Sequence, residues 1–234
     1  MEVCRRMDFV KFWRRPHPAT ISLIGSLALG LSVLPTAWSQ LQSQEPAATP
    51  TGEVLERFVA DVEDLTAMFE QQVYDADGQL LEESAGEFKL LRPNRFAWYY
   101  ATPDEIEIVA DGESLWIYDV ELEQITVAPL TDLATSPALL LSGGSSVNEH
   151  YEINEIASAD DDRWLELWPL DADSEFSSAK VAFRDGVPRV IELVDGLLQT
   201  TRIQFSAVEV NSGLRPREFR FDPPDGVDVI GADD

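Results

Sequence analysis

The sequence of 234 residues has almost no cysteine and very little histidine. Its single cysteine is Cys4, near the amino terminus, so an internal disulfide, a thiol nucleophile in the body of the chain and a cysteine metal cluster are all excluded. One of its two histidines is His150, which stands between Glu149 and Tyr151 without a second histidine nearby. A lone histidine of this kind is a poor candidate for a metal ligand or a catalytic base. We therefore expect no metal and no other cofactor.

Basic residues are also scarce. The chain has 17 Lys and Arg against 43 Asp and Glu, which gives a formal net charge of −26. A body this acidic repels the phosphates of nucleic acids and anionic lipid headgroups, so we expect neither a nucleic acid partner nor stable membrane insertion. Two explanations of the charge stay open: a solvated surface suited to salty surroundings, or an acidic face that docks basic partners.

No apolar run is long enough for a permanent membrane helix. The most apolar stretch, residues 21–34, covers about 14 residues, whereas a spanning helix needs about 20. It follows five basic residues and precedes small residues at Ala37 and Ser39, which is the pattern of a removable signal peptide. We predict a signal peptide over residues 1–39 and a periplasmic location. An uncleaved anchor facing the same compartment is the alternative.

The rest of the chain is of a size that suits one domain. After a flexible leader predicted over residues 40–50, residues 51–234 form that domain. Thr51 is placed to cap a helix, and the apolar residues that follow it recur with helical spacing. The sequence therefore predicts one long helix over residues 51–64. Its apolar positions are Val54, Leu55, Phe58, Val59, Val62 and Leu65.

From Met68 onward the pattern changes to alternating apolar and polar residues, interrupted by five Asp-Gly pairs that favour hairpin turns. The fold class is therefore mainly β with helices (α+β): a single antiparallel sheet, which at this number of strands curls into an incomplete β-barrel. The predicted strands are 66–74, 80–91, 95–101, 105–110, 114–119, 123–128, 151–158, 163–168, 178–184, 187–194, 199–210 and 217–221.

The strand pattern lapses between residues 130 and 148. There Thr135 or Ser136 can cap, Pro137 can open and Gly143 can close a short apolar helix. A long amphipathic helix, many antiparallel strands and this short apolar helix together predict a curled sheet around a hydrophobic cavity. The two helices would partly cover the cavity as a lid. Periodicity alone also allows helices that simply plug the sheet and leave no cavity.

The most informative segment is an Arg-Pro-Asn turn, residues 92–94, between two strands. Beyond the turn, Phe96, Trp98 and Tyr100 fall on one face of a strand by alternation. An ordinary core stripe beside a surface arginine explains this pattern. Alternatively, the stripe lines a lipid cavity and Arg92 latches a lid by donating to helix-end carbonyls, a task that suits the fixed fork of a guanidinium.

This segment and others in the same order resemble the LolA-type outer-membrane lipoprotein carriers. The Arg-Pro-Asn-x-Phe-x-Trp run and the Asp-Gly-x-x-Leu-Trp-x-Tyr run that begins at Asp111 are the most specific parts, and the resemblance covers nearly all of residues 51–230. The matching stretches are 86–98, 102–105, 111–119, 123–124, 136–141, 205–210 and 219–227.

The resemblance implies a monomeric, non-enzymatic periplasmic carrier. Such a carrier would accept lipoprotein acyl chains from an inner-membrane lipoprotein-releasing ABC transporter and pass them to an outer-membrane lipoprotein receptor. It places the lid latch at Arg92 and a substitution-sensitive aromatic at Phe96. The residues expected to line the acyl cavity are Phe96, Trp98, Tyr100, Leu139 and Leu140.

Three other functions are weighed against this one. A sensor or scaffold domain of the same open-barrel fold would bind lipid or peptide without shuttling it. A glycosidase-like enzyme would need two carboxylates in a cleft. In a chain this acidic, pairs of carboxylates arise by chance, so such a pair would not indicate an enzyme. The outer-membrane receptor itself would carry a lipidated cysteine, which this sequence lacks after its apolar run.

Overall fold

The computed structural model describes residues 52–130, 141, 147–158, 160–172, 174 and 176–231. The chain divides into two units, residues 1–48 and 49–234, and all of the described residues belong to the second. The predicted signal peptide and leader lie outside the described residues. So does most of the short helix expected after Ser136, including Leu139 and Leu140.

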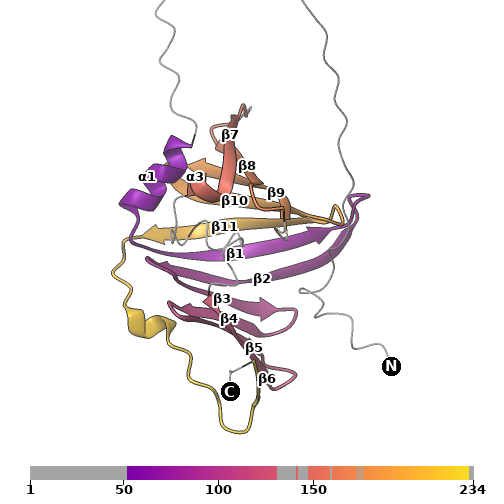
Figure 1. Cartoon of the computed structure of the whole chain (residues 1–234), viewed down its shortest axis with the longest axis vertical. Coiled ribbons are helices and arrows are strands. Elements are labelled where there is room, and N and C mark those ends of the chain that lie inside the picture. The colour runs from indigo at the N-terminus through magenta and orange to yellow at the C-terminus, as the bar shows by residue number, and fades with distance from the viewer. Residues whose placement is uncertain are drawn as a thin grey trace, which may run out of the picture. The chain divides into compact units, whose positions relative to one another are not determined.

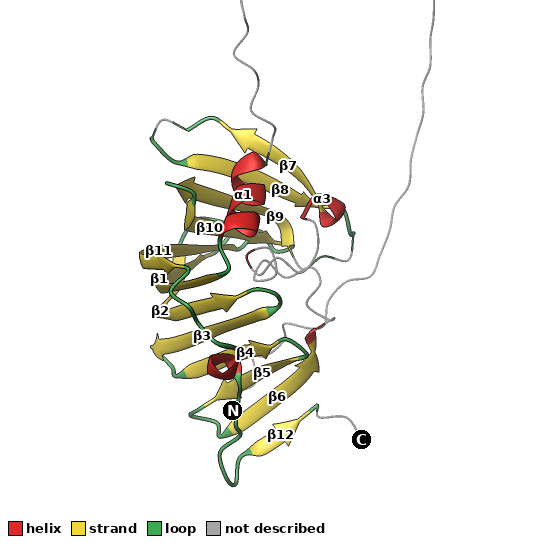
Figure 2. Cartoon of the chain, turned by 90° about the vertical axis from the view of Figure 1, so that its left-hand side faces the viewer, coloured by secondary structure: helices red, strands yellow, loops and turns green. Residues whose placement is uncertain are grey.

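The described residues form one curved sheet of 12 strands (Figure 1). Its order is β12-β6-β5-β4-β3-β2-β1-β11-β10-β9-β8-β7, and every pairing is antiparallel except the parallel pair β12 and β6. β7 and β12 lie at its two edges and do not pair with each other, so the sheet is the predicted incomplete barrel (Figure 2). The strands are β1 (Asp64–Tyr74), β2 (Leu80–Leu91), β3 (Arg95–Thr102), β4 (Ile106–Asp111), β5 (Ser114–Asp119), β6 (Gln124–Pro129), β7 (Tyr151–Ile156), β8 (Arg163–Pro169), β9 (Phe176–Arg184), β10 (Val187–Asp195), β11 (Thr200–Val210) and β12 (Asp228–Ile230).

Local turn chemistry explains the hairpins. In the turn between β1 and β2 the Asp75 carboxylate accepts the backbone N–H groups of Asp77 and Gln79 at 3.0 and 2.8 Å. Asp195 makes the same kind of turn between β10 and β11. Such side-chain hydrogen bonds satisfy backbone N–H groups where the hydrogen bonding between strands ends. The aspartates therefore favour a reversal of the chain at these points.

The sheet buries apolar residues on both faces. On the concave face, alternate residues of the central strands form the main core together with α1 (Glu53–Asp61). On the outer face a smaller core forms where the 3₁₀-helix η2 (Pro216–Phe219) packs against β3 and β4. The smaller core comprises Leu91, Ala97, Val109 and Phe219. A short helix, α3 (Val147–His150), leads into β7. None of the helices in the described ranges is long and apolar enough to cross a membrane.

Two predicted elements are corrected. The helix expected over residues 51–64 ends at Asp61: Val62 is extended, and Asp64 already pairs with Leu91 of β2. Pairing with neighbouring strands thus overrides the helical spacing of Val62 and Leu65. The predicted strand 217–221 is instead the η2 turn. There Pro216 opens the helix, and Phe219 packs onto the sheet face rather than pairing at an edge.

Candidate functional site

Five aromatic rings form a continuous wall on the concave face. Trp98 lies at its centre, with ring centroids 4.3 Å from Phe88, 4.8 Å from Phe69 and 6.0 Å from Phe205. Tyr100 extends the wall, with its ring 5.0 Å from that of Phe69 in an edge-to-face arrangement. These residues come from the adjacent strands β1, β2, β3 and β11, so the sheet order itself assembles the wall.

A glycine permits the close packing of this wall. Gly86 on β2 pairs with Phe69 on one side and Tyr100 on the other. A Cβ at this position would lie 1.8 Å from the Tyr99 carbonyl oxygen and 3.0 Å from Cε1 of Phe69. The missing side chain therefore leaves the space that the Phe69 ring occupies.

Helix α1 covers one end of the concave face (Figure 2). Its buried residues Val54, Leu55 and Phe58 belong to the main core, and the Phe58 ring lies 5.7 Å from that of Phe183 on β9. Leu141, which is helical, is buried in the same core. The expected helical lid is thus seen in part, as α1 and this single residue.

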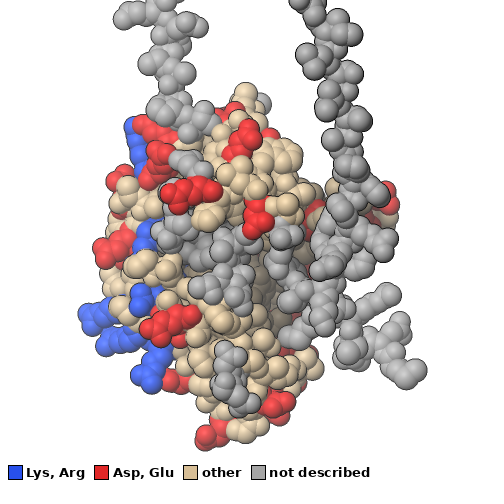
Figure 3. Space-filling view, viewed as in Figure 1, with Lys and Arg blue, Asp and Glu red and all other residues tan. Residues whose placement is uncertain are grey.

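The surface of the concave face is hollowed near its centre, where the visible side chains are uncharged, and acidic residues stand above and below the hollow (Figure 3). An uncharged hollow suits an apolar ligand that reaches it from water, since charged groups at the bottom would lose solvation on binding. Chemically, the arrangement offers apolar contact.

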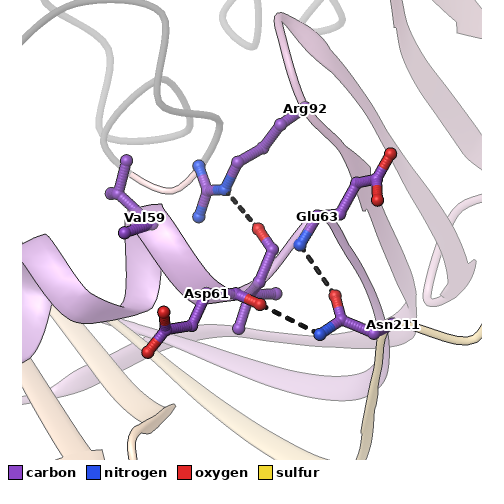
Figure 4. A pocket seen from close by; sticks show the side chains of 7 residues that line it. Val59, Asp61, Glu63, Arg92 and Asn211 are labelled. Carbon is purple, nitrogen blue, oxygen red and sulfur yellow. Dashed lines mark hydrogen bonds between the residues drawn. The ribbon is translucent and has the colours of Figure 1, made fainter.

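Arg92 ties the end of α1 to the sheet (Figure 4). Its Nε donates a hydrogen bond to the Val62 carbonyl at 2.7 Å, and its backbone N–H donates to the Glu63 carbonyl at 2.9 Å. The guanidinium carbon also lies 4.9 Å from the centroid of the Phe58 ring. The predicted latch residue is therefore positioned at the helix-to-strand junction, where α1 meets the sheet.

The remaining donors of Arg92 are unused within the part of the chain that the structure describes. Nη1 and Nη2 are buried and have no hydrogen-bond partner there. Burial lowers the pKa of Arg92 to about 10, so the side chain keeps its charge at neutral pH. Beside it lies an open depression of about 390 Å³, lined by Val59–Glu63, Arg92 and Asn211. A charged guanidinium with donors beyond Nε is equipped to bind carbonyl oxygens.

The same junction is fixed from the other side by Asn211, which sequence reasoning missed. Its Oδ1 accepts the Glu63 backbone N–H at 2.7 Å, and its Nδ2 donates to the Asp61 carbonyl at 3.0 Å. The nearby Asp64 carboxylate accepts the backbone N–H groups of Ser212 and Gly213. Since these partners are almost 150 residues apart, no local pattern could have signalled the contact.

The three predicted cavity residues on β3 share the concave face. Phe96 is 1% exposed, Trp98 is 7% exposed and Tyr100 is half-buried, and all three contribute to the main core. Ala97 and Tyr99 face the smaller outer core, as alternation requires. Phe96 thus lies deepest, while Trp98 and Tyr100 belong to the aromatic wall. Leu139 and Leu140 lie outside the described residues.

Comparison with known proteins identifies the family. A family model described as "Outer membrane lipoprotein carrier protein LolA" matches residues 60–222. The chain is 43% identical to an outer-membrane lipoprotein carrier protein of Halorhodospira halophila over 77% of this chain and 86% of the relative. It is 42% identical to one of Alkalilimnicola ehrlichii over 88% of this chain and 92% of the relative.

A solved structure shares the fold alone. An uncharacterized conserved protein from Thermus thermophilus matches with a TM-score of 0.50 at 12% identity, covering 76% of this chain and 96% of that one. The sequence matches carry the assignment, since they extend over most of the chain and over the Arg-Pro-Asn segment and aromatic wall described above. This chain belongs to the LolA family of outer membrane lipoprotein carrier proteins.

Proposed function

We propose that this protein is a non-enzymatic periplasmic carrier that holds the acyl chains of lipoproteins against its concave aromatic face. The observation that carries the proposal is the wall of five rings in a sheet whose edge strands do not close on each other and which is capped by α1. An open, aromatic, uncharged face can accept flexible hydrocarbon. The family relatives named outer-membrane lipoprotein carrier proteins support the same cargo class.

The proposed route runs between two membranes. Residues 1–39 act as the signal peptide that directs export, and residues 40–50 are a flexible leader before the carrier domain. The carrier works as a monomer that receives its cargo from an inner-membrane ABC transporter and delivers it to an outer-membrane receptor. A net charge of −26 opposes adhesion to anionic membrane surfaces, which suits a protein that must leave the membrane with its cargo.

The proposed latch is Arg92. Nη1 and Nη2, which have no partner among the described residues, donate to carbonyl oxygens of the lid, while Nε holds the end of α1. Opening the lid would break these bonds and uncover the aromatic wall. The side chains proposed to contact acyl chains are Phe96, Trp98, Tyr100, Leu139 and Leu140.

Energetics require that the cargo be held only partly. Full burial of about 45 methylenes from three acyl chains, at about 0.8 kcal/mol each, would give about 36 kcal/mol. The binding free energies of non-covalent complexes do not exceed about 20 kcal/mol, and a carrier that bound so tightly could not release its cargo. Part of the binding free energy must therefore be offset by opening the lid, and a better-fitting site downstream must drive unloading. The sensor or scaffold alternative has no such requirement, and the carrier names of the relatives favour shuttling.

The test is a release assay. Purified protein lacking residues 1–39 is incubated with inner-membrane vesicles that contain the transporter and a radiolabelled lipoprotein, with and without ATP. The expected result is a soluble one-to-one complex of carrier and lipoprotein that forms only with ATP. Lipoprotein that remains entirely in the vesicle fraction would refute the carrier function.

A further inference from the structure

A small polar cluster interrupts the concave face at the end of the aromatic wall. Gln71 of β1 pairs directly with Ser84 of β2, one pleat beyond the pair formed by Phe69 and Gly86. The Tyr100 hydroxyl of β3 donates to Oε1 of Gln71 at 3.1 Å. The alternation that buries Ser84, Gly86, Phe88 and Leu90 places Ser84 on the concave side. Three hydrogen-bonding side chains thus occupy neighbouring positions where the apolar wall ends.

Ser84 is the unusual member of this cluster. It is only 6% exposed, yet its Oγ has no hydrogen-bond partner among the described residues. A buried hydroxyl without a partner costs stability, and each such group in a folded protein calls for an explanation. A ligand that supplies the missing acceptor is one explanation.

The cluster offers donors to that ligand. The Ser84 hydroxyl has no partner in the described part of the chain, and the Gln71 amide has two N–H groups in addition to the oxygen that Tyr100 uses. Burial, with a smaller effect from the charge of Glu82, raises the pKa of Tyr100 to about 12, so its hydroxyl keeps its proton. Glu82 also disfavours a negatively charged ligand such as a free fatty-acid carboxylate. The fitting group is therefore a neutral hydrogen-bond acceptor.

We propose that Ser84, with Gln71 and Tyr100, forms a subsite for an acyl carbonyl oxygen. This oxygen belongs to one of the ester or amide groups through which the fatty chains are attached to the lipid-modified cysteine of the cargo. The inference rests on the proposed carrier function and adds to it a polar anchor. Hydrocarbon lies along the aromatic wall, and the linkage at its end meets the polar cluster. The subsite fixes the position of the chains along the face. Apolar contacts alone cannot do so, because their energy changes little when a chain slides along the wall.

The test compares Ser84→Ala with the parent protein, using a synthetic triacylated cysteine peptide as the probe. The substitution should weaken binding about 3- to 10-fold, the effect of one hydrogen bond. It should leave the melting temperature of the unloaded protein unchanged or higher, because it removes a buried hydroxyl that has no partner among the described residues. A structural role for Ser84 predicts the opposite, a lower melting temperature. Ser206→Ala is the matched control, since Ser206 is an exposed serine that alternates with the buried Phe205 on β11.

Two further probes identify the carbonyl. If Ser84 contacts an ester, its substitution should have no effect on a peptide whose two esters are replaced by ethers. If it contacts the amide, the effect should vanish with a diacylated peptide that has a free amino group. Equal affinity of parent and Ser84→Ala for the triacylated peptide, or the same loss with all three peptides, would overturn the subsite and leave the carrier function standing. If the parent protein bound none of the peptides, both the subsite and the carrier function would be refuted.

Discussion

Arg92 combines two roles that ordinarily conflict. As a structural residue it donates to the Val62 carbonyl and stacks near the Phe58 ring, which holds α1 to the sheet. As a buried cation with two nitrogens unpaired among the described residues, it also carries a desolvation cost. A residue optimised only for stability would satisfy all five donors. In the proposed latch, these two nitrogens form the bonds to the lid that are made and broken during function.

We expect Arg92→Leu to change the free energy of unfolding little, by less than about 1.5 kcal/mol, because the lost hydrogen bond is offset by removal of a buried charge. ATP-dependent release of lipoprotein into solution should nevertheless fall about tenfold or more. Arg92→Lys should also be impaired, since an ammonium lacks the planar fork. Urea unfolding and the vesicle assay measure the two effects.

The control for these variants is Arg95→Leu. Arg95 lies three residues away, at the start of β3, and donates to the Pro93 carbonyl, not to the α1 junction. Its substitution should leave transfer unchanged. Normal acceptance and delivery by Arg92→Leu would show that the arginine is not a latch.

Among the larger elements, the segment after β11 secures the sheet from outside. It passes from Asn211 through η2 to β12, which adds itself in parallel to β6. Phe219 is completely buried in the smaller core, and the Phe221 ring stacks 5.5 Å from that of Trp116. The segment thus braces the side of β3 that is opposite the aromatic wall.

Phe219→Ala should destabilise the protein by about 3 kcal/mol, since it removes a fully buried ring from a closely packed site. Chemical denaturation should detect the loss. Arg217→Ala, an exposed position of the same 3₁₀ turn, should change stability by less than about 0.5 kcal/mol. Because Phe219 faces away from the concave side, lipopeptide binding at low temperature should persist. Loss of binding without loss of stability would mean that the segment belongs to the cargo site.

The elements that the sequence predicted correctly have local causes. Eleven of the predicted strands match observed strands β1 to β11 to within about three residues, because turn-forming Asp residues and alternation act within a few positions. The errors involve packing at a distance. Val62 continues a helical spacing but is the extended residue at the end of α1, just before β1. Phe219 alternates with Phe221 because both pack on a face. β12 has three exposed residues and no pattern of its own.

The site divides in the same way. The aromatic stripe of β3 and its shared face follow from alternation, and Arg92 was proposed as the latch from its turn and from the family resemblance. Asn211 and Ser84 were not predicted. Asn211 acts on residues almost 150 positions earlier, and whether the Ser84 hydroxyl meets a partner among the described residues depends on which strands surround it. Hydrogen bonds of this kind depend on how the strands are arranged in the folded sheet, which no local sequence pattern reveals.

At the scale of the whole molecule, charge is unevenly distributed over the face seen in Figure 3. Acidic residues stand above and below the hollow, while basic residues gather at the lower left of the same view, over η2. Exposed arginines of that segment are Arg215, Arg217 and Arg220. In the proposed function, neutral acyl chains meet the uncharged side chains seen in the hollow, whereas anionic membrane surfaces meet a strongly acidic body.

The central claim, that acyl chains lie on the concave aromatic face, is tested most directly by photo-crosslinking at two adjacent residues of one strand. Trp98 faces the concave side and Tyr99 the outer side, so each is replaced in turn by p-benzoylphenylalanine and loaded with lipoprotein bearing radiolabelled acyl chains. We expect the label to crosslink from position 98 and not from position 99. Equal crosslinking from both positions, or crosslinking from position 99 alone, would contradict the account.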